Sequence, residues 1–384
     1  MDIDFGWILL GLPLAFALGW LASRLDLRQL RIENRRTPKA YFRGLNFLLN
    51  EQQDQAIDAF IEAVQHDPDT SELHFALGNL FRRRGEYERA VRVHQHLLSR
   101  GDLGLFDRQR AQHALALDYL KAGLLDRAED ALLKLDGTPF EQQAHLALLA
   151  NYERARDWPQ AALMASRLEH SGNGSFSNRL AHYLCEQAAA RLASAQPAEA
   201  QALLEQAAST APQAARPRIE LARLQMLQDQ PDQACATLQQ ALIDCPAAAP
   251  LIATPLAQAA LACDRVPGVL EQLKACYQQA PALDLLEAIV TLESATSSDT
   301  STRDWYVHHL EREPSLVAAA KWIAGEKLEH EQFHPQVQQA LDHAVKPLTR
   351  YRCAACGFEA KQHFWQCPGC QTWDSYPARR VEEL

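Results

Sequence analysis

The apolar residues near the start of the chain form one uninterrupted stretch, which runs without a charged residue from Phe5 to Ala22. As a helix, these 18 residues would extend about 27 Å, at about 1.5 Å per residue, which matches the hydrocarbon core of a bilayer. Trp7 and Trp20 stand near its two ends, where amphipathic rings prefer the headgroup region. The pattern predicts a transmembrane anchor over residues 1–23.

The charges around this stretch predict its orientation. Lysine and arginine are absent before it and frequent in the basic linker at residues 24–36. By the positive-inside rule, the N-terminus faces outward and the bulk of the chain lies on the cytoplasmic side. A cleaved signal peptide would require a basic segment before the apolar run, which is absent. The other alternative, a buried helix of a soluble domain, seldom lacks charge over such a length.

Beyond the linker, apolar and small residues recur with a helical period and then repeat on a longer scale. The alanines that mark this repeat are spaced by 34, 38, 33, 39 and 34 residues, and they are Ala56, Ala90, Ala128, Ala161, Ala200 and Ala234. A period near 34 is typical of two-helix tetratricopeptide repeats, in which small residues let neighbouring helices approach. The sequence therefore predicts an all-α solenoid over residues 37–293, with prolines ending the second helices of its repeats.

The repeat pattern weakens after Pro281, and residues 294–346 are expected to form a helical cap that begins with a polar turn or linker at Ser294–Asp304. His308 and His309 suggest a metal site, but with Glu313 they match no recognised ligand motif. Partner contacts should come from polar side chains on the concave face. The plausible ones are Tyr41, Asn46, His74, Asn79 and His113.

Composition and motifs argue against two classes of function, nucleic-acid binding and catalysis. The net charge of -10 over 384 residues gives no reason to expect a nucleic-acid partner, because phosphate neutralisation requires a basic surface. The chain lacks the G-x-S-x-G, H-E-x-x-H, P-loop and dinucleotide-binding motifs, so we expect that it is not an enzyme. Five cysteines are scattered through helical segments, as reduced core cysteines of a cytosolic domain are: Cys185, Cys235, Cys245, Cys263 and Cys276.

The other four cysteines have the spacing C-x2-C-x10-C-x2-C, and they are Cys353, Cys356, Cys367 and Cys370. Two such pairs are typical of a tetrahedral thiolate site for one metal ion, zinc or iron. A module of residues 347–384 is too small to fold on apolar burial alone, so the metal must stabilise it. Its expected aromatic core comprises Tyr351, Phe358, Phe364, Trp365, Trp373 and Tyr376.

Other interpretations of the module are two disulfides or a nucleic-acid-binding ribbon. The ribbon would use five basic residues, which are few: Arg350, Arg352, Lys361, Arg379 and Arg380. The segments YRCAACGF and CPGC resemble rubredoxin-type knuckles. The loop between the cysteine pairs is far shorter than in an electron-transfer rubredoxin, which weakens the third alternative, an electron carrier.

The order of anchor, tetratricopeptide-like repeats and YRCxxCGF with WxCPxCxxW resembles the lipopolysaccharide assembly protein B family of Gram-negative bacteria over the whole chain. The resemblance implies an inner-membrane adaptor with a periplasmic N-terminus and a rubredoxin-like module packed on the repeats. It also implies metal ligation by the four cysteines of the motif and membrane tethering by residues 5–22. The tail after Trp373, DSYPARRVEEL, differs from the form expected of the family.

The resemblance further implies that the adaptor promotes degradation of the lipid A pathway deacetylase LpxC by the membrane protease FtsH. A regulatory inner-membrane protein would relieve this activity. The alternative function is a membrane-tethered scaffold for another envelope machine, and the sequence leaves homo-oligomerisation open.

Overall fold

A computed structural model describes residues 16–20, 42–66, 70–172, 174–296, 299–325 and 334–384. The expected anchor at residues 5–22 lies outside these ranges except for the helical Phe16–Trp20, and the basic linker at 24–36 lies outside them entirely. Among the described residues, no single helix has the length and apolar character needed to cross a bilayer. One pair, Pro231–Asp244 with Pro246–Ala262, meets the criteria jointly but is bent by 116°.

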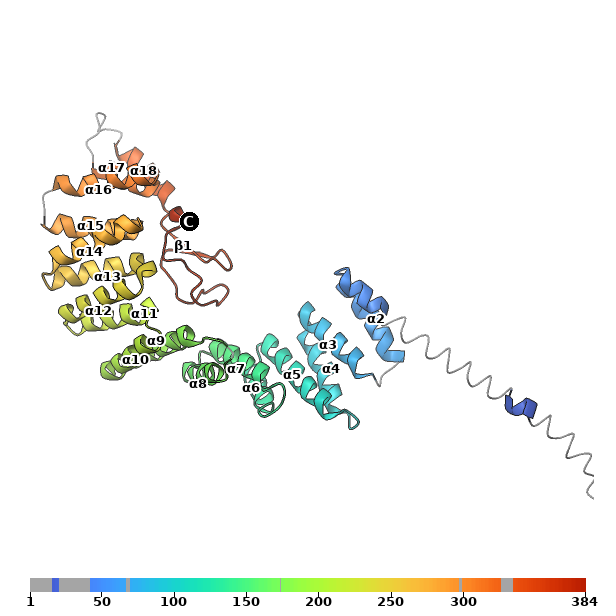
Figure 1. Cartoon of the computed structure of the whole chain (residues 1–384). Helices are drawn as coiled ribbons and strands as arrows, with labels where there is room; N and C mark the ends of the chain where they lie inside the picture. The colour runs from blue at the N-terminus through green and yellow to red at the C-terminus, as the bar shows by residue number, and fades with distance from the viewer. Residues whose placement is uncertain (1–15, 21–41, 67–69, 173, 297–298, 326–333) are drawn as a thin grey trace, which may run out of the picture. The chain divides into compact units, whose positions relative to one another are not determined.

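The chain divides into two units, residues 1–156 and residues 157–384. In the first unit, residues 42–49 are helical, and each later helix packs against the next one along the chain. These helices are α2 (Gln53–His66), α3 (Ser71–Arg84), α4 (Tyr87–Ser99), α5 (Leu105–Ala122), α6 (Leu125–Leu133) and α7 (Glu141–Ala155), labelled in Figure 1.

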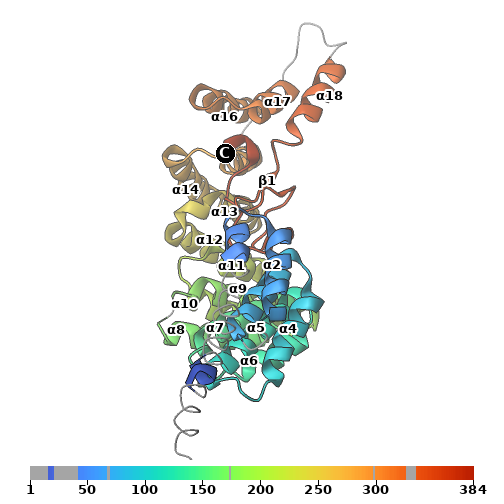
Figure 2. The ribbon, with the colours of Figure 1, turned by 90° about the vertical axis from the view of Figure 1, so that its right-hand side faces the viewer.

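The second unit continues the helical hairpins and ends in a small two-stranded sheet. Its helices are α8 (Trp158–His170), α9 (Ser177–Ala193), α10 (Pro197–Thr210), α11 (Ala215–Leu227), α12 (Pro231–Asp244), η1 (Pro246–Ala248), α13 (Ala249–Ala262), α14 (Val266–Gln279), α15 (Leu283–Thr296), α16 (Asp299–Arg312), α17 (Leu316–Gly325) and α18 (His334–Val345). The strands β1 (Tyr351–Arg352) and β2 (Glu359–Ala360) and the short helix η3 (Val381–Glu383) follow. Strand β1 is labelled in Figure 1 and Figure 2.

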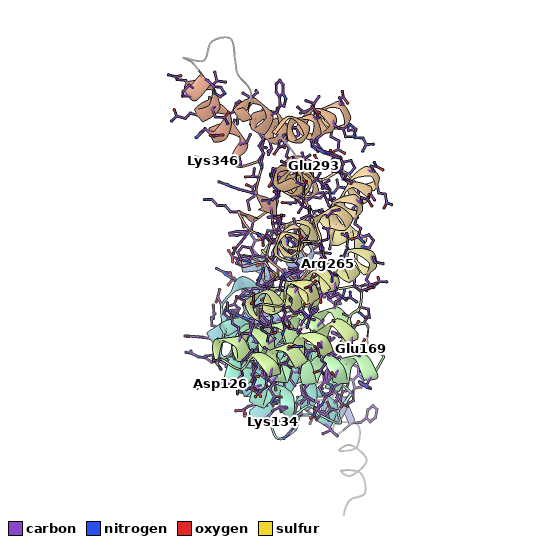
Figure 3. The ribbon with its side chains drawn as sticks, turned by 90° about the vertical axis from the view of Figure 1, so that its left-hand side faces the viewer. Asp126, Lys134, Glu169, Arg265, Glu293 and Lys346 are labelled. Atoms are coloured by element: carbon purple, nitrogen blue, oxygen red, sulfur yellow. The ribbon has the colours of Figure 1, made fainter. Side chains whose placement is uncertain are left out.

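The repeat positions predicted from the sequence form the core. All six marker alanines from Ala56 to Ala234 are fully buried. The helices approach so closely that a Cβ on Gly78 of α3 would lie 2.5 Å from the His94 ring of α4. Charged side chains such as those of Asp126 and Arg265 are exposed (Figure 3). The all-α tetratricopeptide solenoid is therefore confirmed for the described residues.

Helix ends follow simple backbone rules. The residues after α3 and α5 are Gly85 and Gly123, whose φ angles of 85° and 77° are left-handed and cost little without a side chain. Prolines follow the second helices of later repeats. Pro212, Pro246 and Pro281 each stand two residues after the ends of α10, α12 and α14, as the sequence predicts.

The polar stretch Ser294–Asp304, expected to be a turn or linker, is largely helical in its described residues. Helix α15 runs through Thr296, and α16 already begins at Asp299. The hydroxyls of the polar run are satisfied within the helix, because Ser294 donates to the carbonyl of Thr291 at 2.9 Å and Thr296 donates to the carbonyl of Leu292 at 3.2 Å. Helix α15 therefore extends into the polar run before it ends at Thr296, and residues 297–298, between the two helices, lie outside the described residues.

Candidate metal centre and its contacts with the repeats

Two short backbone turns present the four cysteines of the C-terminal module (residues 347–384). The first turn connects β1 to β2, which pair antiparallel with Arg352 opposite Glu359. Within it the Cys353 amide donates to the Phe358 carbonyl at 2.9 Å, and Gly357 takes a φ of 76°. The second turn closes in the same way, with the Cys367 amide donating to the Thr372 carbonyl at 3.0 Å. Each turn therefore directs its two sulfurs to one side.

The sulfurs of Cys353, Cys356, Cys367 and Cys370 all lie within 4.8 Å of one another. The Cys353–Cys370 distance is 3.8 Å and the Cys356–Cys367 distance is 3.7 Å. Tetrahedral coordination with metal–sulfur bonds of about 2.3 Å requires sulfur–sulfur distances of about 3.8 Å. The four side chains therefore fit a rubredoxin-like metal site, in which zinc and iron are both suited to the thiolate set.

The titration of the thiols shows why a cation suits this cluster. Burial opposes ionisation of Cys353, but hydrogen bonds from Ser375 and from the amides of Ala355 and Cys356 outweigh it and lower its pKa to about 6. For Cys356 the Phe358 amide favours the thiolate, but burial and the neighbouring thiols outweigh that amide and raise the pKa to about 12. Four sulfurs this close cannot all ionise easily by themselves, and a divalent ion would remove that conflict.

Hydroxyl groups surround the sulfurs. The Ser375 hydroxyl is 3.3 Å from the sulfur of Cys353, and the Thr372 hydroxyl is 3.3 Å from that of Cys370. Tyr376, which is buried, donates to the Phe358 carbonyl at 3.2 Å. A thiolate can accept hydrogen bonds from such hydroxyls, so residues that follow the last cysteine help to orient the site.

The aromatic residues of the module divide into two groups, which differs from the single core that the sequence predicts. Tyr351 and Tyr376 are buried around Cys353 and Cys367, with Phe364 beside them. Phe358 is 44% exposed and is not a core residue. The two tryptophans instead pack against the repeats: Trp365 packs on the core of the last hairpins, and Trp373 stacks on the His182 ring of α9 at 4.7 Å.

Trp373 lies at the centre of a polar and aromatic contact with α9 and α11. The Asp374 carboxylate accepts from Nε2 of His182 at 2.8 Å, while Arg216 of α11 donates to Nδ1 of the same ring at 3.4 Å. Arg216 is buried and forms ion pairs with Glu186 at 2.7 Å and with Glu220 at 2.6 Å. Because Arg216 donates to Nδ1, the imidazole proton lies on Nε2, where Asp374 accepts it.

The C-terminal tail (Asp374–Leu384) makes a second contact at the start of α15. Arg380 forms a paired interaction with Asp284, whose side chain is 6% exposed, at 2.6 and 3.1 Å. Tyr351 also donates to Asp284, at 3.2 Å. Burial, and to a smaller extent the negative charge of Asp284, raises the pKa of Tyr351 well above its usual range. The Tyr351 hydroxyl therefore keeps its proton and donates a hydrogen bond to Asp284.

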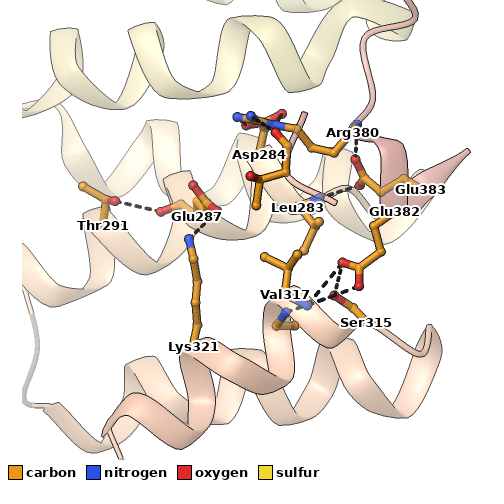
Figure 4. A network of polar contacts seen from close by, with 12 residues as sticks. Leu283, Asp284, Glu287, Thr291, Ser315, Val317, Lys321, Arg380, Glu382 and Glu383 are labelled. Carbon is orange, nitrogen blue, oxygen red and sulfur yellow. Dashed lines mark hydrogen bonds and ion pairs between the residues drawn. The ribbon is translucent and has the colours of Figure 1, made fainter. Parts of the chain in front are cut away.

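The last glutamates of the tail cap two helices (Figure 4). Glu383 accepts from the Leu283 amide at 2.7 Å, at the start of α15. Glu382 accepts from the Leu316 amide at 2.6 Å and from the Val317 amide at 3.2 Å, at the start of α17. Carboxylates at helix N-termini satisfy free amides and complement the helix dipole. The C-terminal tail therefore has defined contacts within the second unit.

Other residues singled out by sequence do not form a site. His309 is buried and accepts from the Tyr277 hydroxyl at 2.6 Å, whereas His308 is 3.9 Å from Glu311. The two histidines therefore serve different contacts. Of the five basic residues of the ribbon interpretation, Arg350 and Arg352 pair with Glu359 of β2, and Arg380 pairs with Asp284 as described above.

The expected groove residues are engaged in contacts within the chain. His74 is buried and lies 3.2 Å from the Thr70 carbonyl, and Asn79 accepts from Arg82 at 2.5 Å. His113 stacks on Phe140. Asn46 accepts from Asn50 at 3.4 Å, and Tyr41 lies outside the described residues. These contacts identify no partner site.

The sequence did not predict which residues hold the C-terminal module on the repeats. His182 and Arg216 carry no motif. For Asp284 a signal existed, because a carboxylate within the apolar run ALDLLEAIV indicates a buried partner.

Three comparisons with known proteins show what this chain is similar to. Residues 351–376 match the rubredoxin metal binding domain, and residues 43–95 and 191–259 match tetratricopeptide repeats. "Lipopolysaccharide assembly protein B" of Escherichia coli strain K12 is 31% identical, covering 97% of this chain and 98% of that protein. The protein of the same name from Haemophilus influenzae is 27% identical over 95% of this chain and 96% of its own length. A solved tetratricopeptide repeat protein from Parabacteroides merdae is 15% identical, covers 67% of this chain and 98% of its own, and gives a TM-score of 0.36.

Proposed function

Because the chain belongs to the lipopolysaccharide assembly protein B family, we propose that it acts in lipopolysaccharide assembly as a membrane-bound adaptor and not as an enzyme. The observation that carries this proposal is similarity to a named relative across nearly the whole chain, repeats and cysteine module included. Tetratricopeptide repeats also present helical surfaces of the kind that bind segments of other proteins.

The metal in this proposal is structural. Cys353, Cys356, Cys367 and Cys370 ligate one zinc or iron ion within residues 347–384. Four thiolate ligands leave no coordination position for a substrate, so the ion stabilises the module and performs no chemistry. In a module of this size, ligation supplies much of the folding free energy.

Membrane attachment gives the adaptor its advantage. In this proposal residues 5–22 cross the inner membrane, with the N-terminus in the periplasm and the repeats on the cytoplasmic side. Confinement to the membrane raises the effective concentration of the adaptor near other membrane proteins. The partners are the protease FtsH, its deacetylase client LpxC and a regulatory inner-membrane protein.

The proposal is tested in a Gram-negative host whose own family member is depleted. Expression of the full chain should restore a low LpxC level, and crosslinking in membranes should capture both FtsH and LpxC. The variant Cys367→Ser should raise LpxC, whereas the matched control Cys276→Ser, in α14 and outside the cluster of four cysteines, should not. Membranes in which neither protein is captured, with LpxC unchanged by the chain, would refute the proposal.

A further inference from the structure

The contacts of the C-terminal tail join two places that the family comparison does not relate, the cysteine cluster and the N-termini of the last solenoid helices. We propose that metal occupancy of the cluster is transmitted through residues 372–384 to α15 and α17, so that loss of the metal uncaps both helices. This coupling concerns the second unit alone and does not depend on the proposed function.

The tail starts in direct contact with the cysteine cluster. The Ala354 amide, inside the first cysteine turn, donates to the Ser375 carbonyl at 2.7 Å, and the Ser375 hydroxyl approaches the Cys353 sulfur. The Tyr376 hydroxyl is 4.0 Å from the Cys367 sulfur, and Ser375 and Tyr376 are both buried. The positions of these two residues therefore depend on the arrangement of the sulfurs, which a tetrahedral ion would define.

The link between this start and the caps is short. Only Pro377, Ala378 and Arg379 separate Tyr376 from Arg380, and proline restricts the backbone of the first of them. At about 3.5 Å per residue, so short a link cannot absorb a large displacement of its ends. The Val381 amide then donates to the Arg350 carbonyl at 2.7 Å, which binds the tail to the residue that precedes β1 and the first cysteine turn.

Few nearby side chains could replace Glu382 and Glu383 as acceptors for the first amides of α15 and α17. Ala282 precedes α15 and has no side-chain acceptor, and the Leu283 amide donates to Glu383 of the tail instead. At α17 the Ser315 hydroxyl accepts from the Ala318 amide at 3.0 Å, and this hydroxyl itself donates to Glu382 at 2.8 Å. Both helix starts therefore lose acceptors when the tail leaves.

Hydrogen exchange on the full chain, purified in mild detergent, tests the coupling. The metal-loaded protein is compared with protein stripped by a chelator and with protein reloaded by zinc alone. We expect exchange at the Leu283, Leu316 and Val317 amides to become about tenfold faster on stripping, the size of effect that loss of a cap produces, and to recover with zinc. Peptides from α3 to α5 should not change.

A variant that lacks only the cap helps to distinguish loss of the helix caps from unfolding of the whole second unit. Glu383→Ala removes the cap without touching a ligand, so exchange at Leu283 should rise while metal content stays the same. The inference is overturned if stripped protein keeps full protection at these three amides. It is also overturned if stripping accelerates exchange equally through α9–α13, because the effect would then not travel through the tail.

Discussion

The interaction between Asp284 and Arg380 provides the most quantitative prediction. Asp284→Ala removes a buried carboxylate that accepts hydrogen bonds from Nε and Nη2 of Arg380 and from the hydroxyl of Tyr351. The remaining guanidinium keeps its bond to the Thr349 carbonyl at 2.6 Å but has no charged partner at Asp284. We therefore expect the C-terminal module to hold less firmly to α15.

The burial of this ion pair sets how much unfolding free energy Asp284→Ala should remove. Removing one partner of a buried ion pair costs about 3–5 kcal/mol, because the other charge is left uncompensated. The Arg380 side chain is 22% exposed, so water can solvate part of its charge, and we expect the lower end, about 3 kcal/mol. In a domain of this size, that loss corresponds to a fall in melting temperature of about 6–12 °C.

A double-mutant cycle with Arg380→Met, measured by urea unfolding of metal-loaded protein, isolates the pair. The coupling free energy should be about 2 kcal/mol, so the double variant should be little worse than Asp284→Ala alone. Glu287→Ala is the matched control on the same helix, because its pair with Lys321 is solvent-exposed and should contribute less than about 1 kcal/mol (Figure 4). Strictly additive effects of the two single changes would refute the interaction.

Three further predictions concern other parts of the chain. Gly78→Ala should lower the unfolding free energy by about 1–3 kcal/mol in urea titrations, because the new methyl group would meet the buried His94 ring; an unchanged midpoint would contradict this packing. Burial lowers the pKa of His309, so the folded state favours the neutral ring. The stability that the neutral ring provides is present above the unfolded pKa, near 6.5, and is lost as pH falls through the folded pKa. His309→Asn, which keeps an acceptor for Tyr277, should flatten the dependence of stability on pH between 7 and 5; an unaltered slope would count against this assignment. Cys367→Ser should release the metal and loosen the C-terminal module, and retention of the ion by the purified variant would show that this sulfur is not a ligand.

Sequence alone predicted the parts of the structure that depend on local rules. Ala56 and Ala234 are buried because close helix packing demands small residues at a regular spacing, which a period of about 34 reveals. The ends of α10 and α12 follow from the prolines beyond them. The cysteine spacing correctly indicated that four sulfurs would converge, because a C-x-x-C turn brings its two sulfurs together and the two turns then pair.

The contacts between the module and the repeats could not be predicted, because they join distant positions. His182 and Asp374 are 192 residues apart, and Asp284 and Arg380 are 96 apart. No local period or motif encodes such a pairing. Helix α15 extends into the polar stretch Ser294–Asp304 for a different reason, since serine and threonine hydroxyls can bond back to the carbonyls of their own helix.

The metal content of the full chain tests the central claim most directly. Elemental analysis of purified protein should find about one zinc or iron ion per chain, and much less in a variant with Cys353 and Cys367 both replaced by serine. A protein that carries no metal, yet keeps Trp373 stacked on His182 and the tail on α15, would contradict the claim that a metal centre organises this end of the molecule.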